Sequence, residues 1–293
     1  MHISVLTDEI IKELSPQKGE TILDGTAGGG GHTLAIAKSI KGQGKFIFID
    51  RDQDALDRTI ERLKEIKGQK IPILGNFSDM KNLLLKNGIK SVDKIILDLG
   101  WSNFQTEDSN RGFSFQKDEP LLMTYKKDLT EDDLTAKDIV NLWSEENLIL
   151  ILKTYGEESW ARKIAGAIVE RRKTKPFETS GDLADLIKKT IPRFGKIHPA
   201  TKTFQALRIA VNNEIISLQK GLKSSLEILN PKGRIAVISF HSLEDREVKN
   251  FFKQKKTNGV GKIITKKPIR PTREETLTNR KARSAKLRIF EKK

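Results

Sequence analysis

The segment TILDGTAGGGGH, residues 21–32, decides the fold of this 293-residue chain. It starts as a short apolar run typical of a buried strand, passes through four consecutive glycines and leads into a helical stretch at 33–40. Similar β-rich runs follow, with helical stretches between them, at 45–50, 70–74 and 94–100. Strand–helix alternation of this kind predicts a parallel sheet covered by helices.

The alternation stops after the fourth strand. Residues 101–132 are predicted to be loop, and 133–191 show helix signals only, including a start at Thr135 that resembles a capping box. Apolar residues spaced three or four apart between Phe204 and Leu229 predict one helix of about seven turns. Three more strands are expected at 234–240, 262–269 and 284–292.

The sequence therefore predicts an α/β fold with a sheet of about seven strands and an all-helical insert after the fourth strand. The expected catalytic domain combines residues 1–106 with 200–293, and the expected helical substrate-recognition domain is 107–199.

Composition restricts the chemistry. Cysteine is absent, which excludes disulfides and a thiol nucleophile, and the four scattered histidines do not favour a zinc site. The net charge is +15, and residues 262–293 contain twelve Lys and Arg against three Glu, a net of +9. Such a segment favours a nucleic-acid backbone as partner, and the alternative is a solvated basic terminus.

No membrane segment or signal peptide is expected. The longest apolar run has about five residues, Leu148–Leu152, whereas a transmembrane helix needs about twenty. The first ten residues do not contain the parts of a signal peptide, which are a basic region, an apolar region and a cleavage site with small residues. We expect a soluble, cytoplasmic protein, with its oligomeric state open and a homodimer among the options.

The glycine loop predicts a nucleoside ligand. It has no Lys after Gly30, as a phosphate-binding loop requires, and Thr33 occupies the place of the third glycine of a dinucleotide fingerprint. The loop fits the Asp-x-[Gly/Thr]-x-Gly-x-Gly pattern of S-adenosylmethionine sites. Asp50, at the end of the second strand, is predicted to accept both ribose hydroxyls, and the alternative is a helix cap.

Asp98 ends the fourth strand, where ligands meet an open α/β sheet. We expect it to contact the methionine part of the donor or a substrate amine, and the alternative is a capping or ion-paired Asp. Without cysteine, methylation of a pyrimidine ring carbon is disfavoured. The remaining targets are exocyclic amines, ring nitrogens and ribose hydroxyls, which can attack the donor directly.

Several blocks resemble the bacterial 16S rRNA (cytosine-N4)-methyltransferase family. They run in order along the chain and include DGTAGGGGH, GNFSD, RGFSF, HPATKTFQALRIAVNNE, SFHSLEDR and ARSAKLRIFEK. The resemblance implies a class I methyltransferase (Rossmann-like) fold, methylation of a cytidine N4 in the decoding region of 16S rRNA, and S-adenosylmethionine as cofactor. Carried over by position, the implied donor contacts are Gly30, Gly31, His32, Asp50, Phe77, Asp98 and Gln105.

Further residues are candidates for the substrate side. Ser239, near the end of the fifth strand, and His241 and Asp245, just after it, are expected to form the catalytic pocket with Asp98; for His241 a structural role is the alternative. Phe77 is expected to stack on adenine, or else to belong to the core. The candidate RNA contacts, of which the first two have an ion pair as alternative, are Arg111, Arg208, Lys266, Lys267 and Arg270.

Two segments depart from the family pattern. Residues 101–105 read WSNFQ instead of VSSPQ, and residues 120–125 read PLLMTY instead of PLDMRM. The expected partner is 16S rRNA, within the small ribosomal subunit. Two alternatives are a DNA amino-methyltransferase, disfavoured because DLGW replaces the usual Pro-Pro tetrad, and an RNA-binding assembly factor without turnover.

Overall fold

The computed structural model describes residues 4–100, 110–126, 128–192 and 198–293. Gln105 and the altered segment at 101–105 lie outside these ranges. The chain forms two compact units, one of Met1–Trp101 with Ile215–Lys293 and one of Ser102–Glu214, which we call the sheet unit and the helical unit. Each unit is described by itself.

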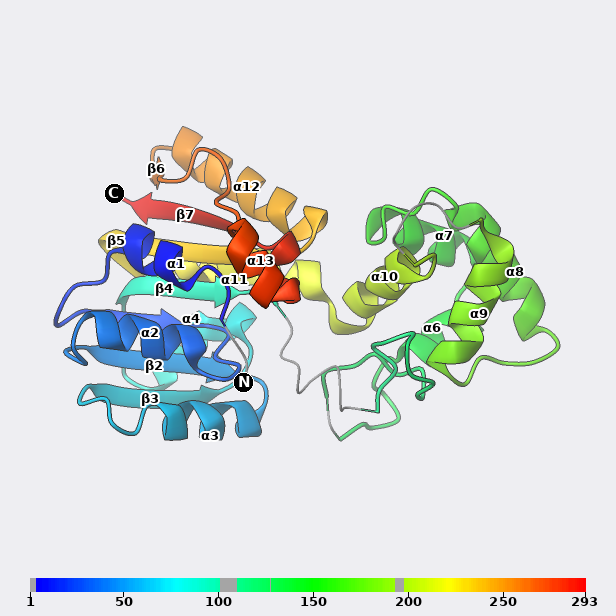
Figure 1. Ribbon diagram of the computed structural model, residues 1–293, viewed down its shortest axis with the longest axis horizontal. Coiled ribbons are helices and arrows are strands. Elements are labelled where there is room, and N and C mark those ends of the chain that lie inside the picture. The colour runs from blue at the N-terminus through cyan, green and yellow to red at the C-terminus, as the bar shows by residue number, and fades with distance from the viewer. Residues whose placement is uncertain (1–3, 101–109, 127, 193–197) are drawn as a thin grey trace. The chain divides into compact units, whose positions relative to one another are not determined.

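The sheet unit contains the predicted seven-stranded sheet, in the order β3-β2-β1-β4-β5-β7-β6 (Figure 1). The first five of these strands are parallel, and β7 runs antiparallel to both β5 and β6. The strands are β1 (Thr21–Asp24), β2 (Lys45–Asp50), β3 (Gln69–Leu74), β4 (Val92–Asp98), β5 (Leu229–Ser239), β6 (Gly261–Ile263) and β7 (Lys286–Lys292).

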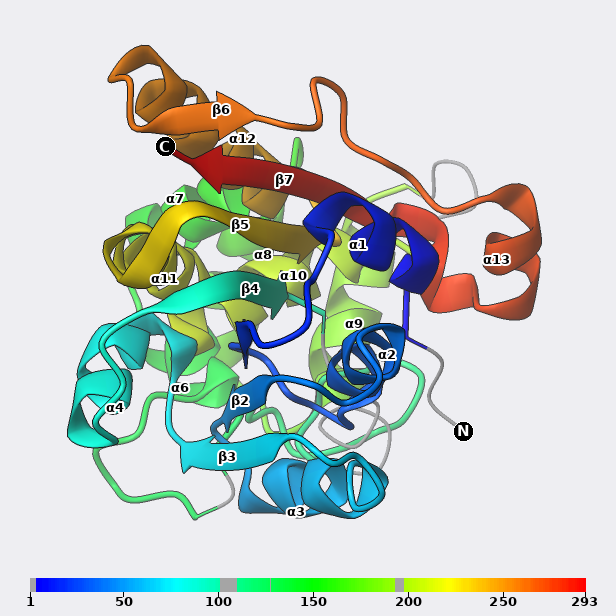
Figure 2. The same cartoon turned by 90° about the vertical axis from the view of Figure 1, so that its left-hand side faces the viewer.

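Helices cover both faces of this sheet because its buried strands alternate between two apolar cores (Figure 2). On one face, Ile22 and Phe48 pack with α1 (Thr7–Leu14), α2 (Gly31–Ser39) and α3 (Gln53–Arg62). On the other face, Leu23 and Ile47 pack with α4 (Met80–Lys86), α11 (Glu214–Ile228) and α12 (Ser242–Thr257). Two short elements, α13 (Arg273–Thr278) and η2 (Arg280–Ser284), precede β7.

The parallel register brings the carboxyl ends of the central strands to one edge. Asp24 pairs with Phe48 of β2 and with Ile96 of β4, so the ends of β1, β2 and β4 lie side by side. Asp24, Asp50 and Asp98 are the last residues of these three strands. The sheet therefore gathers the three carboxylates that the sequence places at strand ends.

Within the residues that the structure describes, the helical unit packs five helices around its own core, which includes Leu148, Ile164, Phe177 and Phe204. The predicted capping box at Thr135 is confirmed, because its side chain and that of Asp138 each accept from the other's backbone N–H. The helices are α6 (Ala136–Leu142), α7 (Glu145–Thr154), α8 (Ala161–Arg172), α9 (Ser180–Thr190) and α10 (Thr201–Asn212). No helix in the described ranges is both long and apolar enough to cross a membrane.

The single helix predicted between Phe204 and Leu229 is wrong. Asn213 adopts a left-handed conformation, with φ 51°, and ends α10 before α11 begins. The Asn212 side chain holds α10 to the helical unit, since its Nδ2 donates to Met123 O (2.7 Å) and its Oδ1 accepts from Tyr125 N (2.9 Å). The second unit boundary therefore falls after Glu214 rather than at 199/200, and the first falls after Trp101 rather than at 106/107.

Asn213→Ala tests this break. Asn tolerates the left-handed region better than Ala, so we expect the substitution to destabilise the protein by about 1 kcal/mol. Scanning calorimetry should show a melting temperature lower by about 2–4 °C. Asn213→Gly is the matched control and should keep or raise the melting temperature, because glycine adopts this conformation without strain. Equal stability of all three proteins would contradict the assignment.

Candidate active site

A buried carboxylate shapes the loop between β1 and α2. Asp24 is 2 % exposed, and its Oδ1 accepts from Thr26 N (3.0 Å) while its Oδ2 accepts from the Thr33 hydroxyl (2.7 Å). Burial raises the pKa of Asp24, although both hydrogen bonds and nearby His32 act in the opposite direction. The two threonines lie on either side of the glycines, so Asp24 holds both ends of the loop.

The glycine elbow, residues 28–31, needs its glycines. Gly28 and Gly30 have φ values of 55° and 70°, which strain a residue with a side chain. A Cβ atom at Gly30 would come within 2.9 Å of Thr59 Cγ2, and one at Gly31 would collide with Ser4 Oγ. The elbow thus packs tightly against α3 and the N-terminal segment.

Asp50 closes the elbow from β2. Its Oδ2 accepts from Gly28 N (2.8 Å) and its Oδ1 from Asp52 N (3.0 Å), and burial raises its pKa. The alternative role, capping the next helix, falls to Asp52, whose side chain accepts from Asp54 N (3.1 Å). Asp50 therefore serves the elbow and not α3. Its contact with a ribose stays a prediction.

Asp98 joins the same group from β4. Its backbone N–H donates to Thr26 Oγ1 (2.7 Å), and its Oδ1 accepts from Gly100 N (3.1 Å). Its Oδ2 lies 3.3 Å from His32 Nε2. The sheet thus brings Asp98 and His32, which are 66 positions apart in the sequence, into direct contact.

His32 is a buried polar side chain in need of a partner. It is 6 % exposed, and within the described part of the chain neither ring nitrogen makes a hydrogen bond with acceptable geometry. Buried polar groups are normally satisfied by protein, water or ligand. This orphaned imidazole, the strained elbow and two carboxylates with raised pKa together fit a polar, cationic ligand such as S-adenosylmethionine. Gly30, Gly31, His32, Asp50 and Asp98 are the described residues that would hold it.

Phe77 opens a short 3-10 helix, η1 (Phe77–Asp79), after β3. Its ring packs on α11, where a Cβ at Gly221 would come within 2.6 Å of it, and its Cβ lies near Gly25. The side chain is half-buried and contacts the core formed by α4 and α11. Phe77 is thus a core residue at the edge of the site, and adenine stacking stays a prediction.

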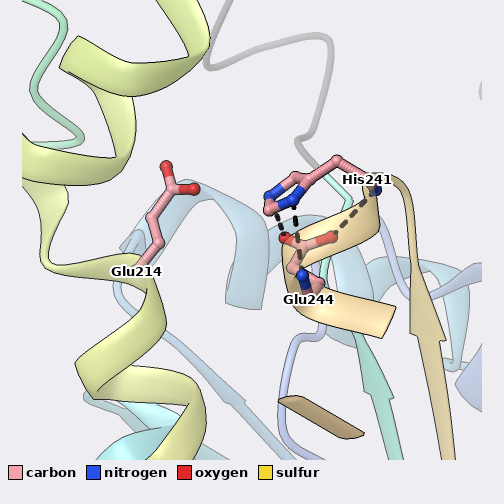
Figure 3. Close-up of side chains that lie close together, drawn as sticks. All are labelled: Glu214, His241 and Glu244. Atoms are coloured by element: carbon pink, nitrogen blue, oxygen red, sulfur yellow. Dashed lines mark hydrogen bonds and ion pairs between the residues drawn. The ribbon is translucent and has the colours of Figure 1, made fainter. Parts of the chain in front are cut away.

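His241 and Ser239 are occupied by structural contacts. His241 caps α12: its Nδ1 accepts from Glu244 N (3.4 Å), and its backbone N donates to Glu244 Oε2 (3.4 Å) (Figure 3). Glu244 Oε2 also accepts from Phe240 N (2.8 Å). Figure 3 also draws Glu214, the first residue of α11. Ser239 is 1 % exposed, and its hydroxyl donates to Lys286 O (3.4 Å) of β7. Their catalytic roles stay predictions, with the capping alternative favoured for His241.

Asp245 is bound to β7. Its Oδ1 accepts from Arg288 Nε (2.6 Å) and its Oδ2 from Arg288 Nη2 (3.2 Å) and Lys286 Nζ (3.4 Å). Burial alone would raise the pKa of Asp245, but the hydrogen bonds and charges of Arg288 and Lys286 outweigh it and lower that pKa. This geometry indicates an ion pair that fixes α12 to the sheet.

The candidate RNA contacts differ in availability. Arg208 is 3 % exposed and makes two hydrogen bonds to Glu214 (2.8 and 2.9 Å), which favours the ion-pair alternative, and its contact with RNA stays a prediction. Arg111 is partly exposed and donates to Lys126 O (2.8 Å). In contrast, Lys266, Lys267 and Arg270 are all exposed.

Two contacts were not predicted from the sequence. Thr26 binds the backbone of Asp98, and Glu244 binds the backbone of Phe240 and His241. Glu244 carried a partial signal, since Glu three residues after the cap is typical of a capping box, although His241 stands here in place of the usual Ser or Thr. Thr26 carried no such signal in the sequence. Its contact with the backbone of Asp98 depends on the pairing of β1 with β4.

Asp245→Asn separates structural from catalytic roles. A carboxyl group whose pKa is lower in the folded than in the unfolded protein stabilises the fold at any pH above the unfolded pKa, which is about 3.9 for Asp. This stabilisation is lost as the pH falls through the folded pKa. We therefore expect a melting temperature about 2–6 °C lower at pH 7, from loss of a partly buried ion pair, with the difference shrinking below about pH 4. Exposed Asp185→Asn is the control and should melt as the wild type does. Lost turnover at unchanged stability would support the catalytic role instead.

Comparison with known proteins shows the family of the chain. The ribosomal RNA small subunit methyltransferase H of Clostridioides difficile is 42 % identical over 309 residues, covering 99 % of this chain and 98 % of its own. That of Sulfurihydrogenibium sp. is 46 % identical over 291 residues and covers 98 % of both. Among solved structures, a putative methyltransferase from Streptococcus mutans in complex with SAH covers 100 % of both chains, with 13 % identity and a TM-score of 0.46. The sequence profile of the MraW methylase family matches residues 1–293, and the chain belongs to this family.

Proposed function

We propose that this protein transfers a methyl group from S-adenosylmethionine to the N4 amine of a cytidine in the decoding region of 16S rRNA. The observation that carries the proposal is the meeting of three strand-end carboxylates, Asp24, Asp50 and Asp98, around a glycine elbow with an orphaned histidine. The names of the relatives, which specify small-subunit rRNA, support the substrate. We place the reaction in the cytoplasm, on the small ribosomal subunit, and a homodimer stays a prediction.

The donor supplies an electrophilic methyl group on a sulfonium, and the chain supplies its binding site. Asp50 would accept the ribose hydroxyls, and the first-turn N–H groups of α2 would bind the carboxylate of the donor. The carboxyl groups of Asp24 and Asp98 would lie close to the positive charges of the donor. Burial keeps the pKa of Asp24 and Asp50 raised in the free protein, and a cationic ligand offsets that cost.

Asp98 serves the acceptor. The exocyclic amine of cytosine is a poor nucleophile because its lone pair is conjugated with the ring. A carboxylate that accepts a hydrogen bond from the amine favours the pyramidal geometry needed for attack. Gly100 N fixes one oxygen of Asp98, which leaves Oδ2 directed toward His32 and the site. The cytidine must be unstacked from the RNA to reach it.

The RNA is bound by exposed cations of the sheet unit. Lys266, Lys267 and Arg270 lie between β6 and α13, and within the described residues none of them forms an ion pair with a carboxylate. Lys262, just before them, is instead bound to Glu291 (2.8 Å). Unpaired exposed cations of this kind are available to phosphates.

Asp50→Asn tests the donor site. The amide keeps one acceptor for the elbow but cannot accept both ribose hydroxyls, so affinity for S-adenosylhomocysteine should fall about 10–100-fold. Isothermal titration calorimetry measures this loss. Asp52→Ala, which removes the α3 cap two residues away, is the matched control and should lower stability by about 1 kcal/mol while leaving affinity within about twofold. Equal affinity losses in both variants would argue against a ribose contact.

Asp98→Asn tests the reaction. We expect methyl transfer to undermethylated 30S particles to fall at least about 100-fold, because the acceptor amine loses its carboxylate. Binding of S-adenosylhomocysteine should weaken by less than about tenfold. Tritiated methyl incorporation followed by mass spectrometry of nucleosides should identify N4-methylcytidine with the wild type. Donor binding without any incorporation by the wild type would favour the assembly-factor alternative, and a different methylated nucleoside would overturn the target.

A further inference from the structure

His32 and Asp98 each have a side-chain atom without a hydrogen bond, and these two atoms face each other. His32 Nε2 lies 3.3 Å from Asp98 Oδ2, but the angle between the groups is not that of a hydrogen bond. Oδ1 of Asp98 accepts from Gly100 N (3.1 Å), whereas Oδ2 accepts no hydrogen bond from any residue that the structure describes. The pair is therefore close to a bond that the free protein leaves incomplete.

Burial makes this incomplete pairing unusual. The side chain of His32 is 7 % exposed and that of Asp98 is 18 % exposed. Both ring nitrogens of His32 are shielded from solvent, and neither has a hydrogen-bond partner in the described part of the chain. Buried polar groups are normally paired, and an exception calls for an explanation such as a role in catalysis.

Regular elements hold the two residues in place. Asp98 ends β4, and its backbone N–H donates to Thr26 Oγ1 (2.7 Å). His32 lies in the first turn of α2, and its neighbour Thr33 donates its hydroxyl to Asp24 Oδ2 (2.7 Å). The meeting of imidazole and carboxylate is thus fixed by the sheet and by the start of a helix, as a positioned pair requires.

The backbone and the side chain of His32 can serve different partners. The backbone N–H, in the first turn of α2, has no partner within the helix and suits the carboxylate of the donor. The side chain instead faces Asp98. A substitution of His32 keeps the N–H and removes only the imidazole, so the two roles can be separated.

The charged groups around the ring are mostly acidic. Asp98 of β4 lies at Nε2, and Asp24 of β1 is close enough for its charge to interact with that of His32. From α3, Arg62 Nη1 lies 3.3 Å from the Cβ position at Gly31, one residue before His32. A proton that reaches the imidazole would therefore lie near two carboxyl groups.

We propose that His32 is a positioning residue that orients Asp98 and takes up, through it, the proton that the acceptor amine loses. The proposal rests on the proposed function, which supplies the methyl donor and the amine. The lone pair of N4 forms the bond to the methyl carbon while the carbon–sulfur bond breaks and leaves its electron pair on sulfur. The N4 proton passes to Asp98 Oδ2 and then to His32 Nε2, so that Asp98 is ionised again, and the imidazole later releases the proton to solvent. An imidazole is a stronger base than a carboxylate in water, which favours this direction.

His32→Gln tests the proton uptake. The amide can donate a hydrogen bond to Asp98 but cannot take up a proton, so the single-turnover rate of methyl transfer to undermethylated 30S particles should fall about 10–100-fold. Affinity for S-adenosylhomocysteine should stay within about threefold. The wild-type rate should fall as the pH is lowered through the range in which histidines titrate, about pH 8 to 5, because a protonated ring cannot accept. The variant should lack this fall.

Exposed Lys38→Gln, on the same helix, is the matched control and should keep the rate and the pH profile of the wild type. The double variant Asp98→Asn, His32→Gln should be within about twofold of Asp98→Asn alone, because His32 acts through Asp98. A further loss of about tenfold in the double variant would overturn the proposal. A tenfold lower affinity of His32→Gln for S-adenosylhomocysteine, with a normal rate once bound, would assign the side chain to the donor instead.

Nuclear magnetic resonance tests the pair without turnover. The chain has four histidines, so their imidazole Cε1–Hε1 signals can be assigned by substitution. Asp98→Asn should shift the His32 signal, whereas Asp245→Asn, which removes a carboxylate bound to Arg288, should leave it in place. An unshifted His32 signal in Asp98→Asn would contradict the pairing even if His32→Gln folded poorly. If the wild type methylated no nucleoside, the proposed function would fail, and this signal would still decide whether His32 orients Asp98.

Discussion

The hydrogen bonds of the buried Asp24 carboxylate fix the geometry of the whole site. They join Thr26 and Thr33, on either side of four glycines, and Thr26 in turn accepts the backbone N–H of Asp98. One residue at the end of the central strand thereby sets the path of the elbow and its alignment with β4. Burying a carboxylate is costly unless it is hydrogen-bonded, and the two threonines satisfy this requirement. The elbow can then carry strained glycines at Gly28 and Gly30, since its ends are held.

Environment divides the carboxylates of the sheet unit into two kinds. Burial raises the pKa of Asp24 and Asp50, whose neighbours are mostly neutral donors, whereas Arg288 and Lys286 lower the pKa of Asp245 in spite of its burial. A carboxylate that already has a cationic partner gains little from a second one. A desolvated carboxylate bound only by N–H and O–H groups gains more from a cationic ligand. This difference favours the elbow, and not the start of α12, as the place where the donor binds.

Local patterns in the sequence predicted the features that depend on local chemistry. Strand–helix alternation gave the seven-stranded sheet, and the strand ends gave Asp50 and Asp98 at one edge. The helix break at Asn213 was missed because the apolar spacing continues across it, while the left-handed turn depends on one asparagine and on the contacts of Asn212 with residues 123 and 125. The pairing of Asp245 with Arg288 was missed as well, since it requires the antiparallel insertion of β7 beside β5. For Arg208 the sequence left an RNA contact and an ion pair open, because its partner Glu214 lies beyond the turn at Asn213.

The glycine elbow brings several segments of the sheet unit together. Gly28 N donates to Asp50 of β2, and Arg62 Nη1 of α3 lies 3.3 Å from the Cβ position at Gly31. Any side chain at Gly31 would collide with Ser4 and displace the guanidinium, and one at Gly30 would collide with Thr59. The last glycines of the run thus allow α3 and the N-terminal segment to pack closely against the start of α2.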